Sequence, residues 1–306
     1  MKILGWGQCL GETALSGAAL EGVRPAGEVW MKTGILSRRR STRSTAVLAA
    51  EALRQALALA DREPAALILS TNSGDQWVPP TATSVARILG LRCPAFDLNA
   101  ACAGGLYALR VAAGLPGPVA IVAAETVSRF CSGAPGDWCS VIFGDGAGAV
   151  VVETPFEAAW SWGTAPEGWE WMTVRPPEER GRMDGARLLE AAVPLCADAL
   201  REAAAHAGVT VADLDVLVPH QANLRLLEAL AARLGVPMGK VVTTVQHTGN
   251  LSSASLLVAL ATALEAGMVR DGHRIGLVAF GAGLTWGAMV GTVEVPVCVE
   301  EPWIPA

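Results

Sequence analysis

The chain has 306 residues, of which 52% are hydrophobic and 17% are charged, and its formal net charge is −6. A chain of this length buries a large core, as one large domain or two smaller ones. The negative charge excludes a protein that binds polyanions over its whole surface, so we expect no nucleic-acid partner and a local basic patch for any phosphate-bearing ligand.

Cysteine usage and apolar runs indicate the compartment. Seven cysteines form no CxxC pair and no spacing typical of zinc, so no metal site is expected. The odd count, together with an N-terminal segment that lacks an apolar leader, predicts reduced thiols in the cytoplasm.

The apolar run 100–124 is interrupted by Arg110, Pro116 and Pro118, and each piece is too short for a bilayer. We therefore expect a buried helix followed by a buried strand there, and no membrane partner.

Apolar periodicity predicts helices and strands that alternate along the chain. The first half has predicted helices at 44–59, 81–89 and 103–113, and strands at 65–70, 94–98 and 119–125. The second half has predicted helices at 186–206, 223–234 and 252–266, and strands at 214–220, 241–245 and 274–280. Short apolar runs between helices are typical of a largely buried α/β sheet.

The two halves of the sequence resemble each other. The first closes on "FGDGAGAVVVE" (143–153) and the second on "FGAGLTWGAMVGTVEV" (280–295). We interpret this as a duplication, with halves at 1–155 and 156–306. Between them, the four tryptophans of "WSWGTAPEGWEW" (160–171) are spaced so that a hairpin would place all four indoles on one face. The alternative for this segment is an aromatic ligand clamp.

Three turns carry candidate catalytic residues. Cys102 lies in "AACAGG", between a strand and a helix, where helix N–H groups and the helix dipole would lower the pKa of a thiol. Packing as a small hydrophobe is the alternative for Cys102. His220 follows the apolar strand "DVLVP", and Asn250 precedes the serines that open the last helix. Each is also compatible with a structural role, as a satisfied histidine and as a capping asparagine.

Taken together, the motifs resemble β-ketoacyl-acyl carrier protein synthase III, a condensing enzyme of the thiolase superfamily. The resemblance rests on segments that occur in the family's order: "TGILSRR" (33–39), "CPAFDLNAACAGGLYAL" (93–109), "IFGDGAGAVVVE" (142–153), "MDGARLLE" (183–190), "LVPHQANLRLLEALAARLG" (217–235), "GNLSSAS" (249–255) and "AFGAGLTWGA" (279–288). It implies a five-layered αβαβα fold of two duplicated halves, an obligate homodimer, and a catalytic triad of Cys102, His220 and Asn250. It also implies that the backbone N–H groups of Cys102 and Ala282 form the oxyanion hole.

The resemblance extends to substrates. It implies acylation of Cys102 by an acyl-CoA, followed by decarboxylative condensation with malonyl-acyl carrier protein, with no tightly bound cofactor. Asn223 and Arg225 of "HQANLR" are predicted to lie near the pantetheine arm and phosphates of CoA. A separate basic run of Lys32, Arg38, Arg39, Arg40 and Arg43 is predicted to bind CoA phosphates or an acidic carrier protein, and a solvated positive loop is its alternative. Phe280, Gly105 and a partner subunit's Trp77 are predicted to shape the acyl pocket.

Two other functions remain open at this point. One is an acyltransferase that moves the acyl group to an acceptor other than malonyl thioester. The other is a non-catalytic dimer partner. Retention of Asn250 favours condensation, and retention of Cys102, His220 and Asn250 together argues against a non-catalytic subunit.

Overall fold

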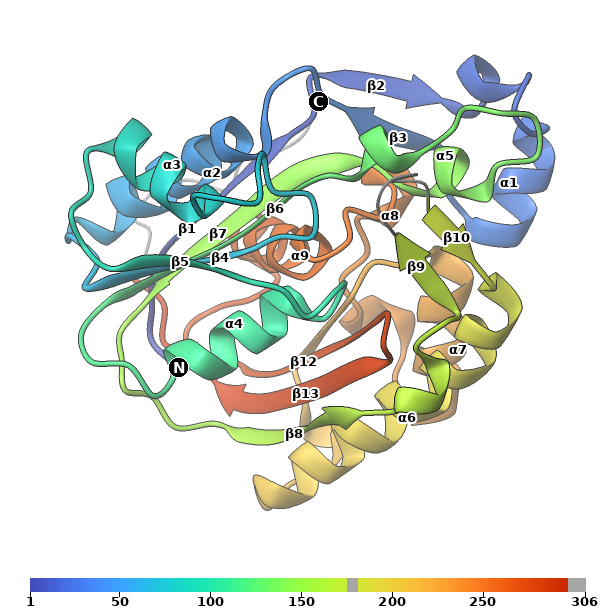
Figure 1. The fold of residues 1–306 in the computed structure, drawn as a ribbon. Coiled ribbons are helices and arrows are strands. Elements are labelled where there is room, and N and C mark those ends of the chain that lie inside the picture. The colour runs from blue at the N-terminus through green and yellow to red at the C-terminus, as the bar shows by residue number, and fades with distance from the viewer. Residues whose placement is uncertain (175–180, 297–306) are drawn as a thin grey trace.

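The structure is a computed structural model that describes residues 1–174 and 181–296. Figure 1 shows two β-sheets with helices between them and further helices outside, which is the predicted five-layered arrangement. In the described part of the chain, no helix combines the length and the apolarity needed to cross a membrane.

The first sheet has the strand order β1-β7-β6-β4-β5. Its strands are β1 (Ile3–Leu10), β4 (Ala66–Ser70), β5 (Ala95–Leu98), β6 (Val119–Thr126) and β7 (Asp145–Val152). β4 runs parallel to β5 and β6, whereas β7 runs antiparallel to β6 and β1. β6 and β7 are buried along their whole length, which explains their continuous apolar sequences. Helices α2 (Thr45–Ala60) and α3 (Thr81–Leu89) cover the outer face.

β1 was not predicted, because glycines interrupt its sequence. Gly5 and Gly7 weaken the strand pattern of "ILGWGQCL", yet the structure needs them. A side chain at Gly5 would collide with the backbone of Ala56, and one at Gly7 with the backbone of Ala52. The glycines therefore allow α2 to pack directly on the strand.

The second sheet repeats the arrangement with the order β11-β12-β13-β8. Its strands are β8 (Ala159–Thr164), β11 (Val216–Pro219), β12 (Arg274–Gly281) and β13 (Thr285–Thr292). The pairings are parallel, antiparallel and antiparallel, as in the series β4-β6-β7-β1. α6 (Gly185–His206) covers the outer face, and α7 (Leu224–Leu234) packs beside α6. The sheets thus show the duplication, whereas the boundary at residue 155 stays a prediction.

Helices α4 (Gly104–Ala112) and α9 (Ala254–Glu265) lie between the sheets (Figure 1). α9 packs against β1, β6 and β7 on one side and β11 on the other, and α4 packs against β4, β6, β12 and β13. A helix buried on all sides is expected to be apolar all round, and this is true of α9. The central layer therefore links both sheets into one core.

The short elements lie apart from the two main sheets. They are the strands β2 (Thr13–Ser16), β3 (Ser37–Arg40), β9 (Met172–Val174) and β10 (Gly181–Met183), and the helices α1 (Ala26–Thr33), α5 (Trp138–Ile142) and α8 (Val245–Thr248). Figure 1 places α1, α5, α8, β3, β9 and β10 near one another at one end of the molecule.

Two predicted β features are wrong. The strand predicted at 241–245 is a single bridge from Val241 to Leu217, because the chain turns at once into α8. The tryptophan hairpin does not form either, since β8 pairs with β13 and β9 pairs with β10. Trp162 instead contacts the Tyr107 ring at 5.2 Å between centroids, whereas Trp169 is 58% exposed. The first two tryptophans of the segment are therefore placed by the pairing of β8 with β13, and not by a hairpin within the segment.

Candidate active site

Cys102 lies in the turn between β5 and α4. β5 ends at Leu98 and α4 begins at Gly104, and the residue before the cysteine, Ala101, has a left-handed backbone with φ 49°. Such a conformation is uncommon outside glycine and is often found at functional sites. The Cys102 side chain is buried, and its Sγ lies 3.4 Å from Ser252 Oγ.

The environment of the thiol differs from the prediction. Burial, together with the charge of Glu125, raises the pKa of Cys102 to about 11, although the Ser252 hydroxyl acts to lower it. The pKa of the thiol is therefore raised, whereas the sequence predicted a lowered one. Removal of the thiol from water opposes its ionisation and is the dominant cause.

His220 follows β11 and is buried. Its backbone N–H donates to Val278 O at 2.8 Å, and its ring lies edge-on to Phe280 with centroids 5.6 Å apart. Burial lowers the pKa of His220 to about 3, so the imidazole is neutral near pH 7. A neutral imidazole carries one N–H donor and one acceptor nitrogen. The residue is therefore equipped to donate a hydrogen bond to a developing anion without carrying a charge.

The Asn250 amide is held in one orientation. Its Oδ1 accepts hydrogen bonds from Ser252 N at 2.8 Å and from Ser255 Oγ at 3.4 Å. Its backbone bonds to the segment before β7, with Asn250 N donating to Ile142 O at 2.9 Å and Gly144 N donating to Asn250 O at 2.9 Å. Because the oxygen is occupied as an acceptor, the amide NH2 group is left to act as a donor.

The three residues come together at the carboxyl ends of the strands. Ser252 contacts Cys102 and bonds to Asn250, and so connects these two residues. His220 contacts Phe280, and the next residue, Gly281, lies against the cysteine turn, where an added Cβ would lie 2.6 Å from Cys102 N. The carboxyl edges of two sheets therefore meet here, as expected for sites in α/β proteins.

Two backbone amides are available for an oxyanion. Among the described residues, neither Cys102 N nor Ala282 N donates a hydrogen bond to another residue. Ala282 follows the glycine that touches Cys102 N, so the two amides lie in adjoining turns. Unoccupied N–H groups in this arrangement can stabilise negative charge on a carbonyl oxygen.

The predicted acyl-pocket residues have different surroundings. Phe280 borders His220, and an added Cβ at Gly105 would lie 2.8 Å from Ser253 O. The absent side chain at Gly105 therefore lets α4 pack on the start of α9, and its role in an acyl pocket stays a prediction. Trp77 is 85% exposed in the loop before α3, so in one protomer it does not line an enclosed pocket.

The predicted CoA-binding residues divide into two groups. Arg225 lies with its guanidinium 5.5 Å from the centre of the Trp30 ring and donates to Met31 O at 3.1 Å. Lys32 pairs with Glu28 at 2.8 Å and approaches the Trp138 ring at 5.3 Å. We call Trp30, Lys32, Trp138 and Arg225 the α1–α7 cluster. Trp138 was missed, although it is a lone tryptophan in the polar loop "GAPGDWCS".

Asn223 belongs to the same region as the N-cap of α7. Its Oδ1 accepts from Leu226 N at 2.8 Å, so its amide oxygen is occupied and its NH2 group remains to contact a ligand. This capping role accounts for an asparagine at the start of the helix without any ligand.

The rest of the basic run serves the fold. Arg38 is fully buried in β3, and none of its guanidinium nitrogens has a hydrogen-bond partner in the described chain. Burial lowers the pKa of Arg38 to about 10. Because a CoA phosphate in solution does not reach a side chain with 0% exposure, we leave Arg38 out of the proposed site.

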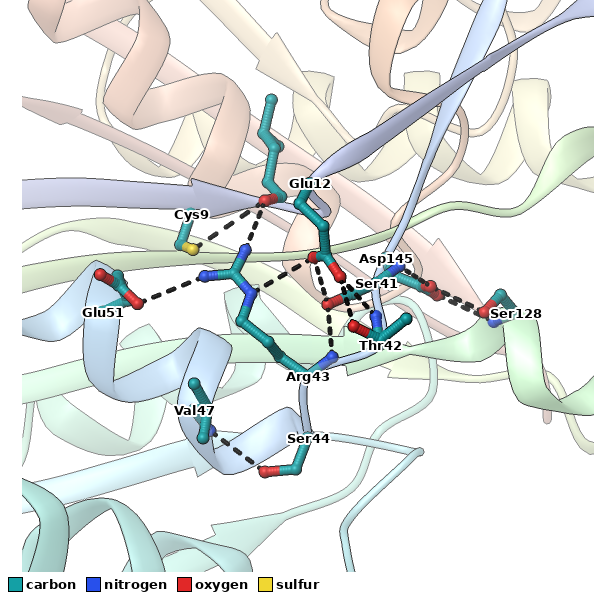
Figure 2. Close-up of polar contacts among 11 residues, drawn as sticks. Cys9, Glu12, Ser41, Thr42, Arg43, Ser44, Val47, Glu51, Ser128 and Asp145 are labelled. Atoms are coloured by element: carbon teal, nitrogen blue, oxygen red, sulfur yellow. Dashed lines mark hydrogen bonds and ion pairs between the residues drawn. The ribbon is translucent and has the colours of Figure 1, made fainter.

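Arg43 is used in a surface network (Figure 2). It pairs with Glu12 and with Glu51, each at 3.3 Å, and donates to Leu10 O at 3.1 Å. Hydrogen bonds from Thr42 and Ser41 hold the pKa of Glu12 well below its usual value. The network fixes the loop between β3 and α2, so Arg43 is not free to bind a phosphate.

Sequence reasoning also missed the polar groups behind Cys102. They are Asn72 after β4, Glu125 near the end of β6, and Ser252 and Ser253 before α9. Polar letters directly after two buried strands, in "LSTNS" and "AAET", were the available signal.

Comparison with known proteins agrees with this geometry. The family model for 3-oxoacyl-[acyl-carrier-protein] synthase III matches residues 96–164, and the model for its C-terminal part matches residues 204–293. A β-ketoacyl-[acyl-carrier-protein] synthase III 2 from Streptomyces coelicolor is 38% identical over 304 residues, covering 94% of this chain and 92% of the relative. The chain belongs to the β-ketoacyl-[acyl-carrier-protein] synthase III family.

Solved structures of the family have the same fold. The 3-oxoacyl-(acyl carrier protein) synthase III of Pseudomonas aeruginosa superposes with a TM-score of 0.91 at 34% identity, covering 97% of this chain and 99% of the other. The priming β-ketosynthase of the R1128 polyketide pathway superposes with a TM-score of 0.88 at 32% identity, covering 96% of each chain. The predicted thiolase-like fold is therefore confirmed.

Proposed function

We propose that this protein condenses an acyl group from acyl-CoA with malonyl-acyl carrier protein, with Cys102, His220 and Asn250 as catalytic residues. The observation that carries the proposal is the set of contacts around the buried Cys102. Ser252 contacts Cys102 and bonds to Asn250. The turn after Phe280 lies against Cys102, and the Phe280 ring packs on His220. The family relationship supports a condensing enzyme.

In the first half-reaction, Cys102 Sγ attacks the carbonyl carbon of the acyl thioester. The carbonyl oxygen becomes an oxyanion, and the N–H groups of Cys102 and Ala282 donate to it. The carbon–sulfur bond to CoA then breaks, and the thiol proton passes to the departing sulfur. A free CoA and an acylated Cys102 result.

In the second half-reaction, the malonyl thioester loses carbon dioxide and leaves an enolate. We assign His220 Nε2–H and the Asn250 NH2 group as donors to the enolate oxygen. The neutral state of His220 suits this role, since the ring can donate one hydrogen bond without protonating the carbanion. The carbanion attacks the acyl carbon on Cys102, which releases the β-ketoacyl product and restores the cysteine.

A homodimer is part of the proposal. β5 lies at the edge of the first sheet, and an unpaired edge offers backbone groups to another strand. Phe96 on β5 is 37% exposed, and Trp77 and Val78 in the loop before α3 are each 85% exposed. Apolar side chains beside an open edge support a second copy as the partner, with Trp77 entering that copy's acyl pocket.

The test is to incubate the protein with a panel of acyl-CoAs and to weigh it intact by mass spectrometry. We expect a mass gain of one acyl group, lost in Cys102→Ala and kept in Cys196→Ala, a matched buried cysteine outside the site. Added malonyl-acyl carrier protein should remove the adduct and yield a β-ketoacyl product. Absence of an adduct with every acyl-CoA would contradict the proposal. An adduct without a condensation product would instead favour transfer to another acceptor.

The α1–α7 cluster leads to a second prediction. Arg225→Ala should raise KM for acyl-CoA about tenfold and leave kcat nearly unchanged, because a hydrogen bond to a charged group contributes ~1.5–3 kcal/mol. Steady-state rates against acyl-CoA concentration measure this. Arg233→Ala, an exposed arginine on the same helix, is the control. Equal KM values for the two variants would remove Arg225 from the CoA site.

A further inference from the structure

A buried carboxyl group lies behind Cys102, and the two half-reactions do not use it. Glu125 has 0% exposure, and no positively charged side chain of the described chain bonds to it. Its side-chain donors are Ser73 Oγ, Ser253 Oγ at 2.6 Å and Asn72 Nδ2 at 2.8 Å, and the backbone N–H groups of Asn72 and Ser253 also donate to it. Burial raises the pKa of Glu125 above the ordinary carboxyl value. Burial of an ionisable group without an opposite charge is energetically unfavourable, which indicates that Glu125 has a specific role.

The hydrogen bonds between Glu125 and Cys102 form a chain of defined direction. A carboxyl oxygen accepts, so the Asn72 group that faces Glu125 Oε1 is the NH2 and not the amide oxygen. The same nitrogen lies 3.0 Å from Ser252 Oγ, and its second hydrogen points to that oxygen. Ser252 Oγ thus accepts from Asn72.

The partners of the serine hydroxyl bear on where its proton points. Ser252 Oγ has two hydrogen-bond partners among the described residues, Asn72 Nδ2 and Cys102 Sγ at 3.4 Å. The Asn72 NH2 group donates and offers no acceptor, so the sulfur is the acceptor to which we assign the hydroxyl hydrogen. A sulfur that accepts a hydrogen bond is stabilised as the thiolate.

We propose that Asn72, Ser252 and Glu125 are positioning residues for the nucleophile: Glu125 orients the Asn72 amide, Asn72 orients the Ser252 hydroxyl, and Ser252 donates a hydrogen bond to Cys102 Sγ. The inference rests on the proposed nucleophilic role of Cys102. The relay also joins the halves, since Asn72 follows β4, Glu125 lies near the end of β6, and Ser252 precedes α9.

The relay acts against an unfavourable electrostatic background. Among the titratable groups of the described chain, Glu125 is the one whose charge acts on Cys102, and its charge opposes the thiolate. His220 is neutral and provides no counter-charge. The Ser252 hydroxyl is therefore the side chain that favours the ionised sulfur.

The backbone at Ser252 offers a clean variant. Its φ is 50°, a left-handed conformation that strains alanine but suits glycine. Ser252→Ala therefore removes the hydroxyl and keeps the backbone strain that serine already has, whereas Ser252→Gly removes the hydroxyl and relieves that strain. If both variants have the same effect on Cys102, the loss of the hydroxyl causes it and the change in backbone strain does not.

The experiment measures the pH dependence of Cys102 alkylation by iodoacetamide on the full chain, with the Cys102 peptide quantified by mass spectrometry. We expect Ser252→Gly and Ser252→Ala to raise the midpoint of the alkylation rate against pH by about one pH unit. At any pH below that midpoint, alkylation should then be slower by about tenfold. Asn72→Ala should change the rate in the same direction. Ser161→Ala, which removes a buried serine hydroxyl that bonds to Glu202, should match the unmodified protein.

Each outcome decides one part of the proposal. Unchanged profiles in both Ser252 variants would overturn the donor role of Ser252. A shift in these variants without one in Asn72→Ala would overturn the orienting role of Asn72 and Glu125. Failure of the proposed function would appear separately, as an alkylated Cys102 that no acyl-CoA acylates.

Discussion

Asn250→Asp should lower the condensation rate by about 10²–10³-fold, because it removes one donor to the enolate oxygen and places a negative charge beside it. The variant keeps the oxygen that accepts from Ser252 N and Ser255 Oγ, so the local fold is preserved. Acylation of Cys102 by acyl-CoA should continue, since Asn250 acts only in the second half-reaction. Single-turnover formation of β-ketoacyl product, measured beside intact mass, separates the two steps.

Asn99→Asp is the matched control for this change. Asn99 is exposed in the same cysteine turn, and its Oδ1 accepts from Ala101 N at 3.1 Å, a bond that aspartate also makes. This variant should condense at a rate close to that of the unmodified protein. If Asn250→Asp condenses as fast as Asn99→Asp, Asn250 is not an enolate donor.

The second large effect is on stability in acid. Burial lowers the pKa of His220 to about 3 from an ordinary value of 6.5, so between these values the unfolded chain binds a proton that the folded protein does not. The free energy of unfolding should therefore fall as pH decreases, and His220 should contribute about 1.4 kcal/mol per pH unit to that slope. Above pH 6.5 the contribution is constant.

Urea unfolding of His220→Gln at several pH values between about 4 and 6 measures this contribution. The variant should lose less stability per pH unit than the unmodified protein. His206→Gln changes an exposed histidine at the end of α6 and should keep the original slope. Parallel curves for His220→Gln and the unmodified protein would show that His220 is protonated in the folded state.

The parts of the fold that the sequence predicted are those with strong local signals. Continuous apolar runs such as those of β6 and β12 are found only where both faces of a strand are buried, and they were placed correctly. Cys102, His220 and Asn250 became candidates because each follows a strand or opens a helix. Their convergence required the recognised order of motifs, because single turns do not report which turns meet in space.

The features that the sequence did not predict depend on contacts between residues that are far apart in the chain. The relay behind Cys102 joins residues 72, 125 and 252, and no local pattern connects them. The close approach of Gly105 to Ser253 O could not be predicted, because the two residues are far apart in sequence. The raised pKa of Cys102 depends on the depth of burial, which composition does not give.

The contact between Gly281 and the cysteine turn limits how this architecture can diversify. An added Cβ at Gly281 would lie 2.6 Å from Cys102 N and 2.9 Å from Ala103 N, so backbone meets backbone there. The spacing between the proposed nucleophile and the proposed oxyanion donors is consequently set by main-chain geometry, and no exchange of side chains alters it. New substrate preferences can therefore arise from the walls around the acyl group, while the reacting centre itself is inherited unchanged.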